Sequence, residues 1–185
     1  MPAEWAPHER TWMAWPTADY TLEPEAEEAY RAWSNVANAI VNFEPVTMLC
    51  EPDAIEIARE YLDSQVEIIA APLNDAWMRD IGPTFVKNAR GQVAGVNWIF
   101  NGWGSQAWAS WGKDSKIAAF IARLAGKELI DSELINEGGG IHVSGSGAVM
   151  LTETVQLGEG RNSTWSRAEV ETEIHEKLGT KDAIW

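Results

Sequence analysis

The sequence contains one cysteine, Cys50, so no disulfide can form within the chain, and a reducing compartment fits this. No apolar run approaches the roughly 20 residues that a membrane-spanning helix needs. The first residues do not have the basic segment followed by an apolar segment that marks a signal peptide. Together these absences predict a cytoplasmic protein.

Basic residues are scarce: 14 Lys and Arg stand against 28 Asp and Glu, which gives a formal net charge of -14. Nucleic acids and anionic membranes bind positive protein surfaces, so the charge argues against both as partners. The acidic excess is compatible with a small cationic substrate. Solubility alone is the simpler explanation of the same excess.

Patterns of metal ligands and phosphate loops are also missing. His8, His142 and His175 are far apart, and there is no His-x-x-x-His or Cys-x-x-Cys spacing. The glycine-rich segments 138–140 and 145–147 lack the lysine and the strand-to-helix context of a phosphate loop. The sequence therefore predicts neither a metal site nor a phosphate loop.

Cys50 is the one candidate thiol nucleophile. It ends an apolar run and precedes Glu51, whose charge would raise the thiol pKa rather than lower it. We predict a buried, unreactive cysteine.

Tryptophan, in contrast, is abundant, with eleven residues. Each brings a large apolar surface and one N–H group that needs a partner. Gathered on a surface they would form a platform for sugars or cations, and scattered among strands they would form core.

Hydrophobic periodicity predicts alternating strands and helices. Helices are expected over 23–41, with Pro24 in the first turn, and over 52–61, 115–125 and 166–178. The third should turn Ile117, Phe120, Ile121 and Leu124 inward, and Ser166 with Glu169 should cap the fourth. Strands are expected over 11–15, 46–50, 66–71, 84–87, 93–100, 128–130, 141–143 and 148–152, with another beginning at 183–185.

The order helix, strand, polar loop and hairpin occurs over 52–99 and again over 115–152. Repeated mixed units that carry a loop at the same end favour modules arranged around a centre. Asp80 and Glu137 precede the two hairpins at matching places, so both carboxylates are expected to face a common axis. We treat 1–185 as part of one α/β domain that continues further, because a module cannot bury its sheet without neighbours.

The polar segment 74–83 holds Asp75, Trp77, Arg79 and Asp80 directly after an apolar run, where scaffolds often place functional groups. Two carboxylates and a tryptophan suit a guanidinium or ammonium group, since a carboxylate matches the guanidinium fork and the indole offers a cation–π face. Two plainer interpretations stay open. Asp80 could pair with Arg79 or stabilise the turn, and Glu137 could cap the glycine loop.

Several segments resemble the agmatine deiminases of the peptidylarginine deiminase-like family, within the guanidine-modifying superfamily. They are 1–16 (MPAEWAPHERTWMAWP), 74–83 (NDAWMRDIGP), 97–104 (NWIFNGWG), 137–143 (EGGGIHV), 151–154 (LTET) and 161–162 (RN). Their order and spacing agree with the family over nearly the whole chain.

The resemblance implies a five-module pseudo-symmetric α/β propeller of the pentein type, with roughly the first half of its modules in this chain. It implies hydrolysis of agmatine to N-carbamoylputrescine and ammonia, in putrescine biosynthesis, without metal or cofactor. A cysteine would attack the guanidinium carbon, and a histidine would act as acid and base. By the same resemblance Asp80 holds guanidinium nitrogens, Trp77 lines the substrate chain, and Glu137 is the active-site glutamate.

The family's Gly-His-x-Asp motif and its nucleophilic cysteine have no counterpart here, and Cys50 does not match that cysteine. We therefore expect the chain alone to be inactive. Other interpretations are a deiminase acting on protein arginine, and a non-catalytic half that works as a homo-oligomer or with a complementing chain. A tryptophan-rich sugar-binding module fits the two carboxylates poorly.

Overall fold

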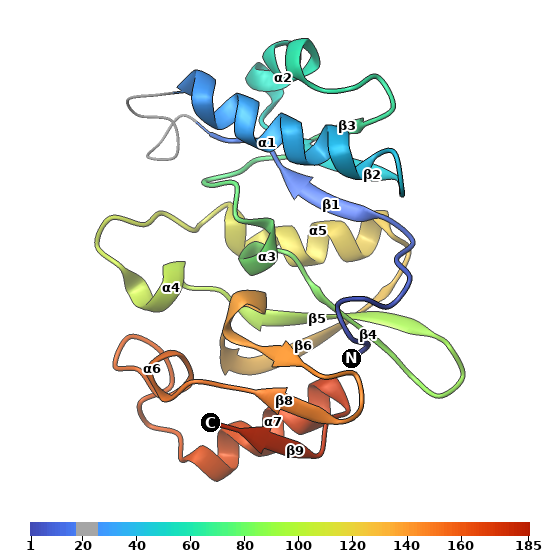
Figure 1. Cartoon of the computed structure of the whole chain (residues 1–185). Coiled ribbons are helices and arrows are strands. Elements are labelled where there is room, and N and C mark those ends of the chain that lie inside the picture. Colours follow the sequence, from blue (N-terminus) through green and yellow to red (C-terminus); the bar gives the residue numbers. More distant parts are fainter. Residues whose placement is uncertain (18–25) are drawn as a thin grey trace. The chain divides into compact units, whose positions relative to one another are not determined.

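The computed structural model describes residues 1–17 and 26–185. The position of Pro24 and the start of the first predicted helix lie outside the described residues. The fold is mixed α/β, as predicted, and the described part contains three sheets of three strands each (Figure 1). It divides into two compact units, one of residues 7–78 and one of residues 1–6 with 79–185.

The helices are α1 (Ala26–Ile40), α2 (Ile55–Tyr61), α3 (Met78–Ile81), α4 (Gly102–Ser105), α5 (Ile117–Leu124), α6 (Glu153–Gln156) and α7 (Arg167–Leu178), with short 3-10 helices η1 (Pro52–Ala54), η2 (Asp114–Lys116) and η3 (Gly138–Gly140). The strands are β1 (Thr11–Ala14), β2 (Val46–Cys50), β3 (Glu67–Ala70), β4 (Thr84–Lys87), β5 (Val93–Ile99), β6 (Glu128–Ile135), β7 (His142–Val143), β8 (Ala148–Met150) and β9 (Asp182–Ile184). No described helix has both the length and the apolar character to cross a bilayer.

The unit of residues 7–78 is a parallel sheet in the order β1-β2-β3, with α1 and α2 as the crossovers between strands. All five residues of the central strand β2 are buried, because a parallel strand of this kind is covered on both faces. Trp15 is 1% exposed and stacks on Tyr30 with ring centroids 5.1 Å apart. Part of the tryptophan content is therefore core.

The other unit contains two copies of one topology. In the first copy β4 and β5 form an antiparallel hairpin, and β5 pairs in parallel with β6 after the helix α5. In the second, β7 and β8 form the hairpin, and β8 pairs in parallel with β9 after α7. Val170, Ile174 and Leu178 of α7 are each 1% exposed or less, and they join a core with strand residues such as Val149.

These sheets confirm the repeated order of elements but change its grouping. The sequence pattern groups each strand with the hairpin that follows it. In the structure each hairpin instead pairs with the strand after the next helix, so that β4 and β5 share a sheet with β6, and β7 and β8 share a sheet with β9. The reason is that neighbouring parallel strands need a crossover connection, and only the helices supply one. The segment between β6 and β7, which holds Glu137, therefore links one sheet to the next.

Two details differ from the predictions. β6 extends to Ile135, beyond the predicted end at 130, because Ser132 and Leu134 are buried while Asp131 and Glu133 face outward, which is the alternation of a strand. Leu124 is 43% exposed rather than inward, since α5 buries the face that carries Ile117 and Ile121. The four-residue helices α3, α4 and α6 were not predicted, as they are too short to show periodicity.

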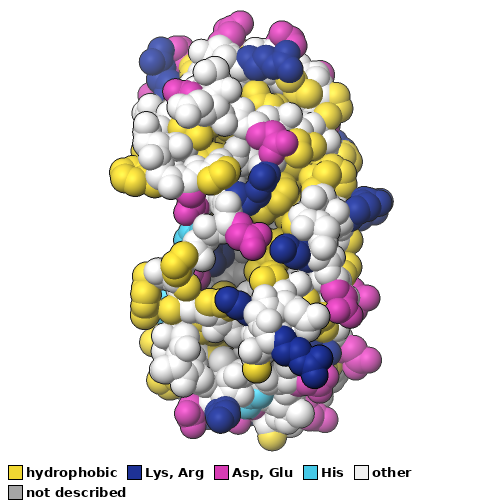
Figure 2. All heavy atoms as spheres, turned by 90° about the vertical axis from the view of Figure 1, so that its right-hand side faces the viewer, with side chains coloured by type: hydrophobic (Ala, Val, Ile, Leu, Met, Phe, Trp, Pro, Cys, Tyr) yellow, Lys and Arg dark blue, Asp and Glu magenta, His cyan; other side chains and the backbone are white. Residues whose placement is uncertain are grey.

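Charged side chains of both signs lie among each other on the face drawn in Figure 2, so neither sign forms a continuous patch there.

The predicted capping box of α7 is present. The Glu169 backbone N–H donates to Ser166 Oγ at 3.3 Å, and the Ser166 N–H donates to Glu169 Oε2 at 2.7 Å. We expect Ser166→Ala to lower the free energy of unfolding by about 1 kcal/mol, because the first turn loses a side-chain acceptor. Urea denaturation measures this. Ser163→Ala, at an exposed turn position, is the control and should change little.

Candidate functional site

Asp80 lies in α3, and its carboxylate receives a hydrogen bond on each oxygen. The indole Nε1–H of Trp103 donates to Oδ2 at 2.9 Å, and the backbone N–H of Gly139 donates to Oδ1 at 3.0 Å. Asp80 thus joins three segments that are far apart in the sequence: the α3 turn, the loop after β5 and the glycine loop after β6.

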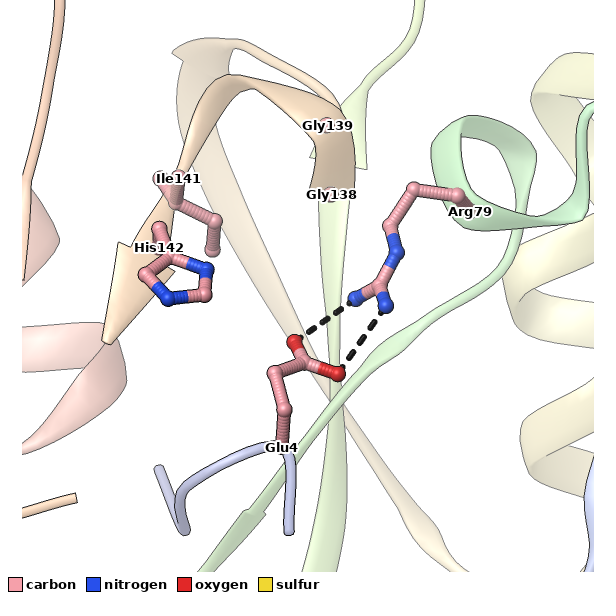
Figure 3. Close-up of a pocket in the computed structure, with 6 residues that line it drawn as sticks. All are labelled: Glu4, Arg79, Gly138, Gly139, Ile141 and His142. Carbon is pink, nitrogen blue, oxygen red and sulfur yellow. Dashed lines mark hydrogen bonds and ion pairs between the residues drawn. The ribbon is translucent and has the colours of Figure 1, made fainter. Parts of the chain in front are cut away.

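Arg79 does not pair with Asp80 through its side chain. Its two terminal nitrogens donate to the two carboxylate oxygens of Glu4, both at 3.0 Å (Figure 3). Its hydrogen bonds with Glu4 raise the pKa of Arg79, and the charges of Glu4 and Asp80 raise it further. The interpretation of Asp80 as a local partner of Arg79 is therefore wrong.

The glycine loop, residues 138–140, lies directly against α3. A side chain at Gly138 would collide with the backbone carbonyl oxygen of Arg79, and one at Gly139 with the carboxylate of Asp80. Glycine is required at position 138 because the two backbones approach so closely there. The segment that follows Glu137 therefore packs directly against the turn that carries Asp80.

Glu137 is 5% exposed and binds Arg161, whose Nη1 donates to Glu137 Oε2. The two side chains are only 7% and 8% exposed, so this is a buried ion pair. The turn that carries Arg161 is fixed by Asn162, which exchanges hydrogen bonds of 2.9 Å with the backbone N–H and C=O of Ile135. The Glu137 side chain does not cap the glycine loop; its backbone carbonyl instead accepts from Gly140 N at 2.9 Å.

An open pocket of about 310 Å³ lies beside this cluster. Glu4, Arg79, Gly138, Gly139, Ile141 and His142 line it, and Figure 3 shows the Glu4–Arg79 pair within it. Asp80 and Glu137 are next to lining residues in the chain, but neither is among them.

Trp77 belongs to the unit of residues 7–78, and 44% of its surface is exposed. Its ring meets that of Trp33 edge to face, with centroids 5.5 Å apart. Asp75, two residues earlier, is fully buried, and its Oδ1 accepts from Ala76 N at 2.7 Å. Of the residues singled out in the segment 74–83, Asp75 is thus buried and Trp77 is partly exposed to solvent.

Sequence reasoning gave no individual role to Trp103 or Arg161, although both stand in motifs that carry the family resemblance. A signal for Trp103 is its place between two glycines in a polar loop. Arg161 has no such signal, because its pairing with Glu137 is evident only once the chain is folded. In residues 1–17 and 26–185, no three His, Cys, Asp or Glu side chains gather as metal ligands would.

Cys50 is fully buried, and burial is the largest cause that raises its pKa to about 12, followed by the charges of Asp53 and Glu51. The thiolate is the reactive form, so the folded chain should not react with a disulfide reagent at pH 8. Release of one thiol equivalent only after denaturation would meet this expectation, and rapid labelling of the native chain would contradict it. The raised pKa of Cys50 also links stability to pH, because the folded chain holds the thiol proton more tightly than the unfolded chain does. The stability that the protonated thiol contributes is complete below the unfolded pKa of about 8.5 and falls as pH rises towards 12.

The Glu137–Arg161 pair makes a second prediction. Arg161→Met leaves a buried carboxylate without its partner, which should lower the free energy of unfolding by about 3 to 5 kcal/mol. Urea denaturation checks this value. Arg31→Met is the matched control: it breaks an exposed pair with Glu27, which solvent screens, so it should change the free energy of unfolding far less. Equal effects of the two substitutions would contradict the assignment of a buried pair.

Comparison with known proteins places this geometry in a family. Residues 1–185 match the family model described as Porphyromonas-type peptidyl-arginine deiminase. A Streptomyces coelicolor protein named "Putative agmatine deiminase" is 57% identical over 187 residues, covering 100% of this chain and 55% of that protein. Agmatine deiminase of Ectopseudomonas mendocina is 40% identical over 190 residues, covering 100% of this chain and 52% of that protein.

Among solved structures, the agmatine deiminase of Enterococcus faecalis is similar with a TM-score of 0.95 and 32% identity, covering 100% of this chain and 52% of that one. The chain thus spans about half the length of the curated relatives it matches. Since the family model covers every residue, the chain belongs to the Porphyromonas-type peptidyl-arginine deiminase family.

Proposed function

We propose that this chain supplies part of the active site of an agmatine deiminase, which hydrolyses agmatine to N-carbamoylputrescine and ammonia. The observation that carries the proposal is the Asp80 carboxylate, held by one donor on each oxygen. A carboxylate oxygen accepts about two hydrogen bonds, so one position on each oxygen is left for a guanidinium fork. The names of two relatives and of one similar structure support the substrate.

In this proposal Asp80 holds the guanidinium nitrogens and Trp77 lines the path of the aliphatic chain. Positioning matters because a delocalised cation is a poor electrophile, and a fixed orientation removes part of the entropic barrier. Glu137 is the active-site glutamate, and Arg161 fixes its place. Water finally supplies the oxygen of the product, and one guanidinium nitrogen leaves as ammonia.

The attacking thiol is the part that this chain does not supply. Cys50 is buried with a raised pKa, which is the opposite of an activated nucleophile. We assign the cysteine nucleophile and the acid–base histidine to the part of the relatives' length that these 185 residues do not span. The propeller of five modules, with this chain as one portion of a single domain, and a cytoplasmic role in putrescine synthesis belong to the same proposal.

A second candidate is a deiminase that acts on arginine within proteins. The description of the matching family, which names peptidyl-arginine, is the observation that favours it. A short arginine peptide and agmatine share the guanidinium but differ in size, so binding experiments with both distinguish the two.

The test has two measurements on the purified chain. Incubation with agmatine should release no ammonia above buffer, because no activated thiol is present. An NMR titration should nevertheless detect binding of agmatine but not of putrescine, which lacks the guanidinium, and Asp80→Asn should weaken it about tenfold.

Ammonia release by the chain would overturn the assignment of the nucleophile elsewhere. Equal binding of agmatine and putrescine would overturn guanidinium recognition. Tighter binding of the arginine peptide would favour the second candidate. Activity that appears only when a complementing chain is added would identify the 185 residues as one part of a divided enzyme.

A further inference from the structure

The loop after β5 contains a backbone conformation that bulky residues rarely adopt. Trp103 has φ 59° and ψ 37°, in the left-handed region, and Ser105 has φ 57°. Only glycine, and sometimes Asn or Asp, takes this conformation readily. A tryptophan there persists only if its surroundings hold it, and such positions cluster at functional sites.

Four contacts hold this loop. The Trp103 ring stacks on Trp108 with centroids 5.5 Å apart, and it meets Phe100 edge to face at 5.1 Å. The side chain of Asn101 accepts from Gly104 N at 2.9 Å and donates to the carbonyl of Gly160 at 2.8 Å. Two aromatic rings therefore pack against the indole, and the Asn101 side chain ties the loop backbone to Gly160.

These contacts fix the direction of the Trp103 indole N–H bond. The Trp103 Nε1–H points at Asp80 Oδ2, opposite the Gly139 N–H at Oδ1. We propose that Trp103 is a positioning residue, which uses its indole N–H to orient the Asp80 carboxylate for a guanidinium group. The inference deepens the proposed function and rests on it.

The same loop also reaches the second carboxylate. Gly104 and Gly160 approach so closely that a side chain at Gly160 would collide with the Gly104 carbonyl oxygen. The next residue, Arg161, binds Glu137. The loop of residues 101–105 thus contacts Asp80 directly and the support of Glu137 indirectly, so it fixes both carboxylates relative to one scaffold.

The first test measures the hydrogen bond itself. In a ¹⁵N-labelled chain, the indole N–H signal of Trp103 is the one that disappears in Trp103→Phe. Asp80→Ala should move this signal and speed its hydrogen exchange, because the indole loses its charged acceptor. Asp131→Ala, which removes the acceptor of Asn97 elsewhere in the same unit, should leave it unchanged.

The second test measures the effect on binding. Trp103→Phe keeps an aromatic ring but removes the N–H together with part of the indole surface, so the dissociation constant for agmatine should rise about tenfold. Trp98→Phe is the matched control, since its indole N–H donates to Thr84 Oγ1 at 2.8 Å in the core. It should lower the urea midpoint and leave agmatine affinity unchanged.

These measurements separate failure of the inference from failure of the proposed function. If the Trp103 signal does not respond to Asp80→Ala, or if Trp103→Phe binds agmatine as well as the parent chain, the positioning role is wrong. A similar loss of affinity in Trp103→Phe and Trp98→Phe also overturns it, because a general loss of stability would then explain both. If the parent chain does not bind agmatine, the proposed substrate fails, and the indole signal alone decides whether Trp103 orients Asp80.

Discussion

One carboxylate organises the candidate site. Asp80 accepts from Trp103 and from the Gly139 backbone, so a single charged group ties together the helix α3, the loop after β5 and the loop after β6. Hydrogen bonds to an ionised acceptor are about twice as strong as neutral ones, and an anion near a core needs such donors. The tight packing of the glycine loop and the unusual backbone at Trp103 are both consistent with the demands of this one group.

The repeated topology explains why these loops carry the polar residues. The third strand of each of these sheets follows a helix and pairs with the hairpin that precedes that helix. The chain then passes from β6 to the next sheet through a short connection. A connection of this kind has no regular ladder to satisfy its backbone groups, and side chains must do so instead. Asn162, with its bonds to both backbone groups of Ile135, is one such side chain.

Much of the fold could be predicted from the sequence, because many of its helices, strands and turns depend on residues that are near each other in the chain. The capping residues of α7, the apolar run of β2 and the turn between β4 and β5 each depend on neighbours in the chain. The sequence pattern predicts β6 only to residue 130, because the outward residues beyond it are charged and weaken the apolar signal of the strand. The pairing of hairpins with later strands is a long-range property, and spacing alone could not show it.

The site divides in the same way. The matching positions of Asp80 and Glu137 in the repeat predict that both carboxylates face a common axis. The donors to Asp80 could not be predicted, since Trp103 lies 23 residues and Gly139 lies 59 residues away. The roles of Asp80, Glu137 and Trp77 in chemistry remain proposals that rest on family resemblance and on this geometry. Arg161 shows the limit of pattern reasoning, because an arginine in a turn is ordinary until it is found buried against a glutamate.

The bare backbone of Gly138 and Gly139 has a consequence for protein engineering. A methyl group at Gly138 would collide with the backbone carbonyl oxygen of Arg79, so substitutions at this position should destabilise the fold. At Gly139 the added group would meet the end of the Asp80 side chain, so substitutions there should displace that carboxylate. Under the proposed function, the exposed Trp77 is a position at which other side chains can be tried to change substrate preference.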